Sequence, residues 1–437
     1  MSIEVTYDNW SASEGKSERE LKSLIKRDIS WGTHITNLHA AEEACAGDAK
    51  ERWLQAEPEI NNLDSGRYED ERFCLEIPDQ NFNIEAEGVD HFISTVAGDV
   101  ILNHDFDSVR VKSFEIQNSK WASAFPGPNV GIDGLYNNIF DNTIQENNRP
   151  ILAFSVKPRV GHTVDDLLSL YEQVANAGFD IVEDDERIVD PENCPFEDRV
   201  KRIGAVQSDY NTSYSPNITG DIETAKERVD IAADHNIQIV KFDVLVGGFE
   251  TLRKLTKYIR TEYSGSIAIT VYPDAYRAYR KLDREFILKM VRLCGGDIVY
   301  AGSPTWSRFE REEGEPREAL EPIHAHHQLL SKPIQVDSEI KSTLPTITNN
   351  QHLSRAELVT TLFRQEYSGH NQYGFFVGGG LSGFPAPIGE AADIWKKCIN
   401  HASSAGLSNY SHFDISEYDQ EFRDLGWDPL DVEEVLD

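Results

Sequence analysis

The sequence contains no apolar run of about 18 residues, the length that a membrane-spanning helix needs. Its first ten residues, MSIEVTYDNW, also lack the basic start and the apolar core of a secretory signal peptide. These two absences predict a cytoplasmic protein without a membrane partner.

Cysteine is scarce and is not arranged for cross-linking. The five cysteines are Cys45, Cys74, Cys194, Cys294 and Cys398. They are far apart and odd in number, and no C-x-x-C pair occurs among them. This spacing predicts reduced thiols and argues against a disulfide framework or a zinc site.

Positive charge is scarce too. The sequence has 42 Lys and Arg residues compared with 75 Asp and Glu residues, which gives a net charge of −33. Such a chain repels phosphate backbones, which argues against a nucleic-acid partner. The acidic residues are spread over the whole chain, as expected of a protein kept soluble in a high-salt cytoplasm, where screening acts over about 3 Å at 1 M salt. We therefore expect a halophilic protein, and an ordinary acidic protein is the alternative.

The length of 437 residues leaves room for a barrel of about 250 residues and a smaller domain. We expect an N-terminal α+β domain over residues 1–135, a barrel over 145–405 and an acidic tail over 406–437. Within the first domain, apolar and polar residues alternate around one amphipathic helix at 86–96. Residues 1–30 are polar, so we expect a loosely held start with a short helix at 18–27.

Apolar runs alternate with amphipathic segments throughout the second half of the chain. The expected strands are 151–157, 179–183, 212–217, 237–244, 267–272, 297–302, 343–348 and 373–378. Eight parallel strands are the number that closes a (β/α)8 TIM barrel. A doubly wound open sheet has the same periodicity and is the structural alternative.

Polar groups follow the first two of these strands. Lys157 ends the first strand on the same face as Ile151, Ala153 and Ser155, and the acidic run 183–186 ends the second. Active sites of parallel barrels lie at the carboxyl ends of the strands. The lysine and the carboxylates are therefore expected to face one pocket.

Several motifs carry a family resemblance. They are Lys157-Pro158-Arg159-x-Gly161, Gly178-x-Asp180-x-x-x-Asp184-Asp185-Glu186, Gly247-Gly248-Phe249, Leu293-Cys294-Gly295-Gly296-Asp297, Gly378-Gly379-Gly380 and Phe125-x-Gly127-Pro128-x-x-Gly131. Over roughly residues 70–405 this pattern resembles the large subunit of ribulose bisphosphate carboxylase, or RuBisCO. Departures from it make the non-carboxylating RuBisCO-like proteins, of haloarchaeal-type acidic composition, the better match. The resemblance implies a small N-terminal α+β domain, a TIM barrel and a homodimer or dimer-based oligomer.

The resemblance also implies roles for the residues at the strand ends. Lys157 matches a lysine that transfers protons, and Arg159 stands where a second lysine is usual. Asp185 and Glu186 match two carboxylates that bind Mg²⁺, which prefers hard oxygen ligands. The third ligand in the family is a carbamylated lysine, and here that position is Glu183.

Two outcomes are open for Glu183. It completes a metal site that needs no CO₂ activation, or it is bound to another group. Lys241 is the candidate partner, because the alternation of its strand directs it into the barrel, where a lone ammonium is costly. We predict a contact of Lys241 with Glu183 or with Asp185.

The anion sites implied by the resemblance are only partly retained. The loop Gly378 to Gly380 is expected to bind a phosphate or carboxylate through its backbone N–H groups. Thr348 lies in a second loop of this kind, where Thr348-Asn349-Asn350 replaces Ser-Gly-Gly. Tyr272-Pro273 replaces a His-Arg pair, Tyr300 replaces a histidine, and a mobile lysine falls near Ser307 or Arg308. Glu42 and Asp99 match residues that complete the site of a partner subunit.

These departures favour Mg²⁺-assisted enolisation of a phosphorylated or acidic keto sugar without CO₂ fixation, followed by isomerisation, tautomerisation or decarboxylation. The substrate would be a small anion with one phosphate or carboxylate. A non-catalytic homologue with a binding or regulatory role is one alternative, and a genuine ribulose-bisphosphate carboxylase is the other.

Overall fold

The structure is a computed structural model of the chain. The residues that it describes are 2–12, 59–62, 73–98, 106–116, 123–140, 143–273, 281–302, 316–331, 334, 340–348, 351–366, 372–404, 413–414, 416–418 and 420. The expected helix at 18–27 and most of the expected tail lie outside these residues. The domain limits drawn from the sequence stay predictions.

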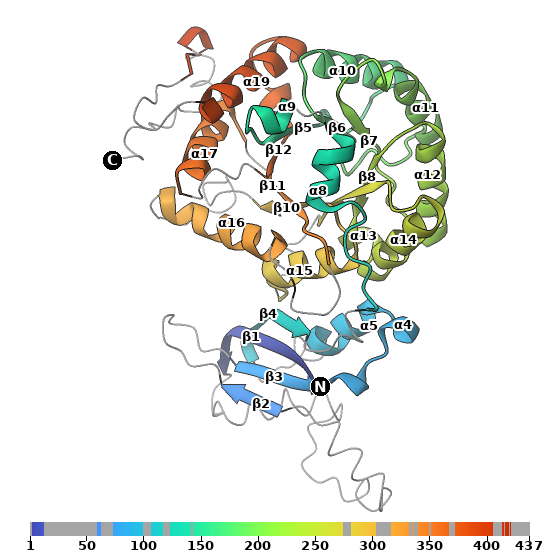
Figure 1. Cartoon of the computed structure of the whole chain (residues 1–437), viewed down its shortest axis with the longest axis vertical. Coiled ribbons are helices and arrows are strands. Elements are labelled where there is room, and N and C mark those ends of the chain that lie inside the picture. Colours follow the sequence, from blue (N-terminus) through green and yellow to red (C-terminus); the bar gives the residue numbers. More distant parts are fainter. Residues whose placement is uncertain are drawn as a thin grey trace, which may run out of the picture.

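The N-terminal part is an antiparallel sheet of four strands in the order β2-β3-β1-β4 (Figure 1). The strands are β1 Ser2–Ala12, β2 Glu59–Asn62, β3 Phe73–Pro78 and β4 Phe106–Ile116. Ile3, Val5 and Tyr7 of β1 are fully buried. The expectation of a loosely held start is therefore wrong for residues 2–12, which form a central strand of this sheet.

The expected helix at 86–96 is divided into shorter pieces. These are α4 Ile84–Glu87, α5 Val89–Ile93 and the π-helical turn η2 Ser94–Gly98. Gly88 separates the first two pieces with a φ of 84°, a left-handed conformation that glycine adopts readily. Phe92 of α5 packs edge-on against Phe114 of β4, so the helical segment covers one face of the sheet.

The larger part is a parallel sheet of eight strands in the order β7-β6-β5-β12-β11-β10-β9-β8. The strands are β5 Ile151–Ser155, β6 Ile181–Glu183, β7 Ser213–Ser215, β8 Ile239–Asp243, β9 Ala268–Tyr272, β10 Ile298–Gly302, β11 Leu344–Ile347 and β12 Gly374–Val377. A parallel bridge between Asn217 and Lys241 joins the two ends of the sheet. The prediction of a (β/α)8 barrel is confirmed, and the open sheet is excluded.

A ring of helices surrounds the barrel (Figure 1). They are α10 Val164–Asn176, α11 Phe196–Gln207, α12 Ile222–Asp234, α14 Phe249–Glu262, α15 Arg284–Cys294, α16 Pro316–Ser331, α17 Leu353–Glu366 and α19 Ile388–Ser404. Among the described helices, none has the length and apolar character that a membrane crossing requires.

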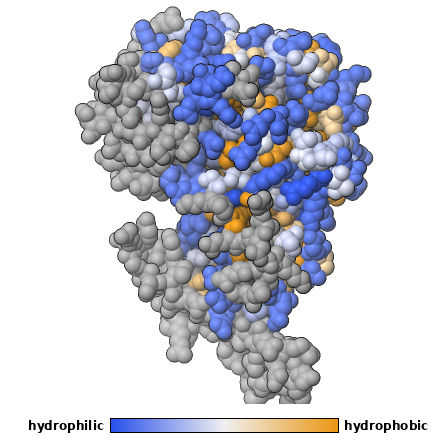
Figure 2. All heavy atoms as spheres, viewed as in Figure 1, coloured by the Kyte–Doolittle hydropathy of each residue, from blue (hydrophilic) through white to orange (hydrophobic). Residues whose placement is uncertain are grey.

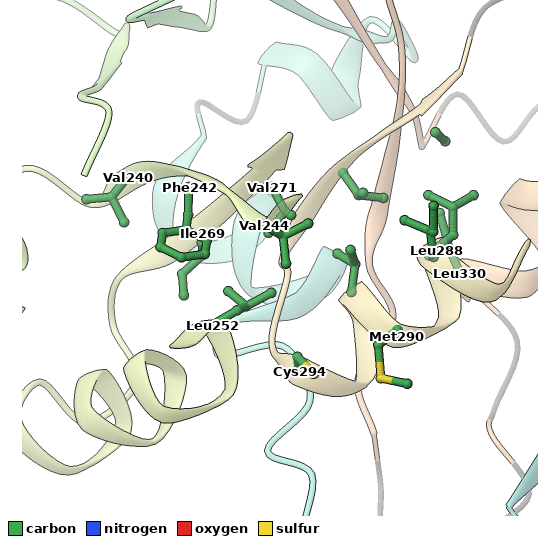
Figure 3. Packing of buried hydrophobic residues seen from close by; sticks show 14 of the residues in the cluster. Val240, Phe242, Val244, Leu252, Ile269, Val271, Leu288, Met290, Cys294 and Leu330 are labelled. Carbon is green, nitrogen blue, oxygen red and sulfur yellow. The ribbon is translucent and has the colours of Figure 1, made fainter. Parts of the chain in front are cut away.

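Outward-facing strand residues and inward-facing helix residues form the main core (Figure 3). Val240 and Phe242 of β8 lie near Leu252 of α14 in this cluster, and Met290 and Cys294 belong to α15. Cys74, Cys194, Cys294 and Cys398 are free and buried, as expected of reduced thiols. On the face shown in Figure 2 the described surface of the barrel is mostly hydrophilic.

A short helical segment closes the amino-terminal end of the barrel. It comprises α8 Gly131–Gly134, η3 Leu135–Ile139 and α9 Thr143–Glu146. Its apolar residues share a second buried cluster with the first residues of six barrel strands. Asp297, just before β10, accepts hydrogen bonds from the backbone N–H groups of Val130, Gly131 and Ile269. The opposite, carboxyl end of the barrel carries the polar residues.

Candidate active site

The register of β5 and β6 places Lys157 beside Asp185. Ser155 pairs with Glu183 in this register, so the residues two positions further along each strand are also level. The ammonium of Lys157 contacts Oδ2 of Asp185, which is fully buried. Burial lowers the pKa of Lys157 to about 8, which suits a lysine that exchanges protons near neutral pH.

Arg159 joins the same group from the loop after β5. Its Nη2 lies 3.0 Å from Oε1 of Glu186, and its Nε lies 3.5 Å from Oδ2 of Asp185. Burial alone would raise the pKa of Glu186, but the charges of nearby Lys241, Lys157 and Arg159 outweigh it and lower that pKa. The structure thus brings together two basic residues and two carboxylates expected from the sequence.

Glu183 lies deeper and has a different partner. Nζ of Lys241 lies 3.0 Å from Oε1 of Glu183 and 2.9 Å from the backbone oxygen of Asp184. The predicted contact between Lys241 and Glu183 is confirmed. Ser155 and Tyr300 donate to the same carboxylate oxygen, and sequence reasoning did not find these two donors.

Tyr272 and Tyr300 fill the barrel next to this ion pair. Their rings pack edge-on with centroids 4.6 Å apart, and Nζ of Lys241 lies 5.3 Å from the centroid of each ring. Burial and the charge of Glu183 raise the pKa of Tyr300 well above its ordinary value, so its hydroxyl stays a donor. Aromatic side chains therefore stand where the resemblance leads one to expect two basic residues.

Hydrogen bonds to the carboxylate of Asp184 hold the acidic segment 183–186 in place. Its carboxylate accepts hydrogen bonds from Arg199, from the hydroxyl of Tyr214 and from the backbone N–H of Asn217. Nδ2 of Asn217 also lies 3.1 Å from the backbone oxygen of Glu186. This network fixes the backbone that carries the carboxylates. Arg199 comes from helix α11, and no local motif marks it in the sequence.

The loop Gly378 to Gly380 lies beside Lys157 because β12 pairs with β5. A Cβ on Gly378 would lie 2.8 Å from Cε of Lys157, and one on Gly380 would overlap the backbone oxygen of Gln351. Gly379 has open space around it. The helix that follows, α18 Gly379–Ser382, has only four residues. Close packing thus accounts for two of the three glycines, and anion binding at this loop stays a prediction.

Other candidate residues are less informative. Thr348 is buried, and its backbone N–H donates to the oxygen of Gly302 at 3.1 Å. Glu42 and Asp99 lie outside the described residues, as do Asn349, Asn350, Ser307 and Arg308. A role for Glu42 or Asp99 at a subunit boundary stays a prediction.

The arrangement of the three carboxylates does not fit a magnesium ion held by all of them. Glu183 is paired with Lys241, while Asp185 and Glu186 are paired with Lys157 and Arg159. In the described part of the chain, no group of three or more His, Cys, Asp and Glu side chains is arranged to hold a metal ion. The described residues therefore do not support the magnesium ion that the resemblance implies.

Comparisons with known proteins agree with this architecture. A family model described as the ribulose bisphosphate carboxylase large chain, catalytic domain, matches residues 138–425. The 2,3-diketo-5-methylthiopentyl-1-phosphate enolase of Geobacillus kaustophilus is 30% identical over 218 residues, which are 47% of this chain and 50% of the enolase. The chain thus matches about half the length of that relative. The ribulose bisphosphate carboxylase of Archaeoglobus fulgidus is 23% identical over 343 residues, 74% of this chain and 73% of the relative.

Solved structures match over almost the whole chain. Octameric RuBisCO from Pyrococcus horikoshii has a TM-score of 0.75 at 20% identity and covers 98% of this chain and 94% of its own. Dimeric archaeal RuBisCO from Hyperthermus butylicus has a TM-score of 0.74 at 22% identity, covering 97% and 94%. At these identities the likeness shows the fold alone.

Proposed function

Since the chain belongs to the ribulose bisphosphate carboxylase large-chain family, we propose that it enolises a small phosphorylated or acidic keto compound without fixing CO₂. The observation that supports this most is the position of Lys157. It is a largely buried lysine with a lowered pKa, at the carboxyl end of β5 and beside a glycine loop in which Gly379 has open space around it. That combination suits the removal of a proton next to a carbonyl group.

The chain's own residues supply the parts that enolisation needs. A pKa of about 8 leaves a fraction of Lys157 neutral near neutral pH, and that neutral amine would take the proton from the carbon next to the carbonyl. The guanidinium of Arg159 is about half exposed and would stabilise the negative charge that develops on the carbonyl oxygen. The substrate's own phosphate or carboxylate would compete with Asp185 and Glu186 for these cations. No step of this proposal uses a metal ion.

The lack of CO₂ fixation is proposed from the two tyrosines. Tyr272 and Tyr300 pack against each other where the resemblance implies basic residues for a second anionic group. One anionic group per substrate is therefore all that we expect the site to bind. The enolase among the relatives is named for a 1-phosphorylated diketone, a compound with one phosphate.

Deuterium exchange tests the proposal. Phosphorylated keto sugars and 1-phosphorylated 2,3-diketones are incubated with the protein in D₂O at high salt, with and without Mg²⁺, and exchange next to the carbonyl is followed by NMR. We expect exchange with at least one compound, and a loss of about 100-fold or more in Lys157→Met. Lys201→Met, an exposed lysine on α11, is the control and should keep full activity. Exchange that persists unchanged in Lys157→Met would exclude the assigned role.

A non-catalytic binding role is the second candidate. It is favoured by the mutual pairing of Lys157 and Arg159 with Asp185 and Glu186, because paired groups are less available for chemistry. In that case the compounds would bind, as measured by calorimetry, without any deuterium exchange.

Genuine carboxylation is the third candidate, since several relatives are named as carboxylases. Incorporation of labelled bicarbonate into product with ribulose bisphosphate would establish it.

We also propose a homodimer, which rests on the family and on solved relatives described as dimeric and octameric. Light scattering after size exclusion in high salt measures the mass directly. A mass of one chain, 49.4 kDa, across the concentration range would contradict this.

A further inference from the structure

The ammonium of Lys241 is fixed inside the barrel by three kinds of partner. A carboxylate oxygen of Glu183 and the backbone oxygen of Asp184 accept its hydrogen bonds at 3.0 and 2.9 Å. Its nitrogen also lies 5.3 Å from the ring centroids of Tyr272 and Tyr300. The side chain of Lys241 is 1% exposed, and an ammonium buried to this degree is costly without a compensating charge. Lys241 and Glu183 therefore depend on each other.

The carboxylate of Glu183 is bound to Lys241 and to two neighbouring hydroxyl groups. Its Oε1 accepts from Ser155 and Tyr300 in addition to Lys241. Its Oε2 has no hydrogen-bond partner among the residues that the structure describes. One carboxylate oxygen is a weak basis for a metal site, because its negative charge is already balanced by the neighbouring ammonium.

Asp185 and Glu186, the other two carboxylates of the barrel mouth, are paired with basic side chains as well. Oδ2 of Asp185 contacts Lys157 and lies 3.5 Å from Nε of Arg159, while its Oδ1 accepts from the backbone N–H of Arg187 at 3.0 Å. Oε1 of Glu186 lies 3.0 Å from Arg159. The remaining acid of this run, Asp184, has its own cation in Arg199.

We infer that Lys157, Arg159 and Lys241 neutralise the three carboxylates of the barrel mouth, and that this mouth works without a divalent metal ion. Three positive side chains face Glu183, Asp185 and Glu186, so a divalent ion would add two positive charges beside three existing ones. The inference concerns the site of the proposed enolisation but does not rest on that reaction, because metal binding is measured without turnover.

Manganese binding tests the inference. Mn²⁺ takes the same oxygen ligands as Mg²⁺, and its free concentration is read by electron paramagnetic resonance. The full-length protein is titrated in high salt, which weakens diffuse binding to its acidic surface. The variants are Asp185→Asn and, as a control, Asp198→Asn at an exposed acid of α11. We expect all three proteins to give the same weak binding curve. One tight Mn²⁺ in the wild type that only Asp185→Asn loses would overturn the inference.

A second measurement tests the Lys241–Glu183 pair itself. Thermal unfolding is compared for the wild type, Lys241→Met, Glu183→Leu and the double variant. We expect each single variant to unfold at a lower temperature, because it leaves one buried charge without its partner, and the double variant to recover part of the loss. Purely additive losses would overturn the pairing. If Lys241→Met does not fold, Glu183→Gln keeps the shape, and its Mn²⁺ curve should equal that of the wild type. Loss of a tight Mn²⁺ in Glu183→Gln would again overturn the inference.

Discussion

Two arginines of the same helix show how burial decides the value of an ion pair. Arg199 and Arg202 both belong to α11, and each lies 2.9 Å from an aspartate, Asp184 and Asp165 respectively. The first pair is fully buried, whereas Arg202 and Asp165 are 52% and 79% exposed. We predict that Arg199→Ala lowers the free energy of unfolding by about 3–5 kcal/mol, since it leaves Asp184 buried and unpaired.

Arg202→Ala is the matched control for that prediction, with an expected cost of about 0–1 kcal/mol. Denaturant unfolding of both variants measures the two costs under one set of conditions. Equal costs would mean that Arg199 does not compensate the charge of Asp184. A large loss would also identify Arg199 as a support of the segment that carries Asp185 and Glu186.

Asp297 provides a prediction on pH. Burial raises its pKa to about 6, although three backbone N–H groups act in the opposite direction. A carboxyl group with a raised pKa in the folded state contributes stability below its unfolded pKa of 3.8, and that contribution is lost as the pH rises through 6. Between about pH 5 and 7 the wild type should lose about 1 kcal/mol relative to Asp297→Asn.

Denaturant unfolding of both proteins at several pH values measures the difference between their free energies of unfolding. All other titrating groups are the same in the two proteins, so their effects cancel in this difference. A constant stability difference between pH 5 and 7 would show that the three N–H donors hold the pKa of Asp297 at or below its ordinary value.

The position of a single side chain was predictable from the sequence where the alternation along its strand determined whether it points into the barrel. Lys241 was expected inside the barrel beside Glu183 or Asp185 on that ground, and the contact with Glu183 is present. The contact of Lys157 with Asp185 depends on the register between two strands, which no single strand reveals. Tyr300 comes from β10, so its contact with Glu183 follows only from the closed barrel, whereas Arg199 reaches Asp184 from the helix that directly follows β6.

At the scale of an element, the loop after β12 contains three consecutive glycines, and substitutions there test why they occur. A Cβ on Gly380 would overlap the backbone oxygen of Gln351, whereas a Cβ on Gly379 would meet nothing within 4 Å. We predict that Gly380→Ala lowers the free energy of unfolding by about 1–3 kcal/mol, because the loop must move away from the backbone that it contacts. Gly379→Ala should change it by less than about 0.5 kcal/mol.

Thermal unfolding of both glycine variants gives the comparison. If the two variants are equally stable, the loop adapts freely and packing does not explain Gly380. If both are destabilised, the close approach of Gly380 to Gln351 does not by itself explain the glycines of this loop.

Elements were predictable where the apolar runs were long. Each of the eight barrel strands falls within its expected range, and most of them are almost continuously apolar because they are buried on both faces, with β7, Ser213–Ser215, as the exception. The strand β1 was missed because residues 1–30 were judged by their polar composition, although Ile3, Val5 and Tyr7 alternate with polar residues in a strand pattern. The helix expected at 86–96 is interrupted at Gly88, where the φ is 84° and the next N–H, that of Val89, donates to Glu250 at 3.0 Å, a long-range contact that the local sequence does not reveal.

At the scale of the whole molecule, the net charge of −33 makes the stability of the fold depend on the salt concentration. Repulsion among the acidic residues opposes the compact state at low ionic strength, where the Debye length is about 10 Å at 0.1 M salt. At about 1 M it falls to about 3 Å, so most of this repulsion is screened. We predict that the temperature of unfolding rises by several degrees between these two KCl concentrations, as measured by circular dichroism.

Sucrose separates screening from the general effect of excluded solutes, because it favours compact states without carrying charge. The rise in unfolding temperature with KCl should exceed the rise with sucrose at matched osmolality. Equal rises would mean that the acidic surface does not govern stability. An unfolding temperature unaffected by KCl would contradict a halophilic protein, and −33 would then be the charge of an ordinary acidic protein.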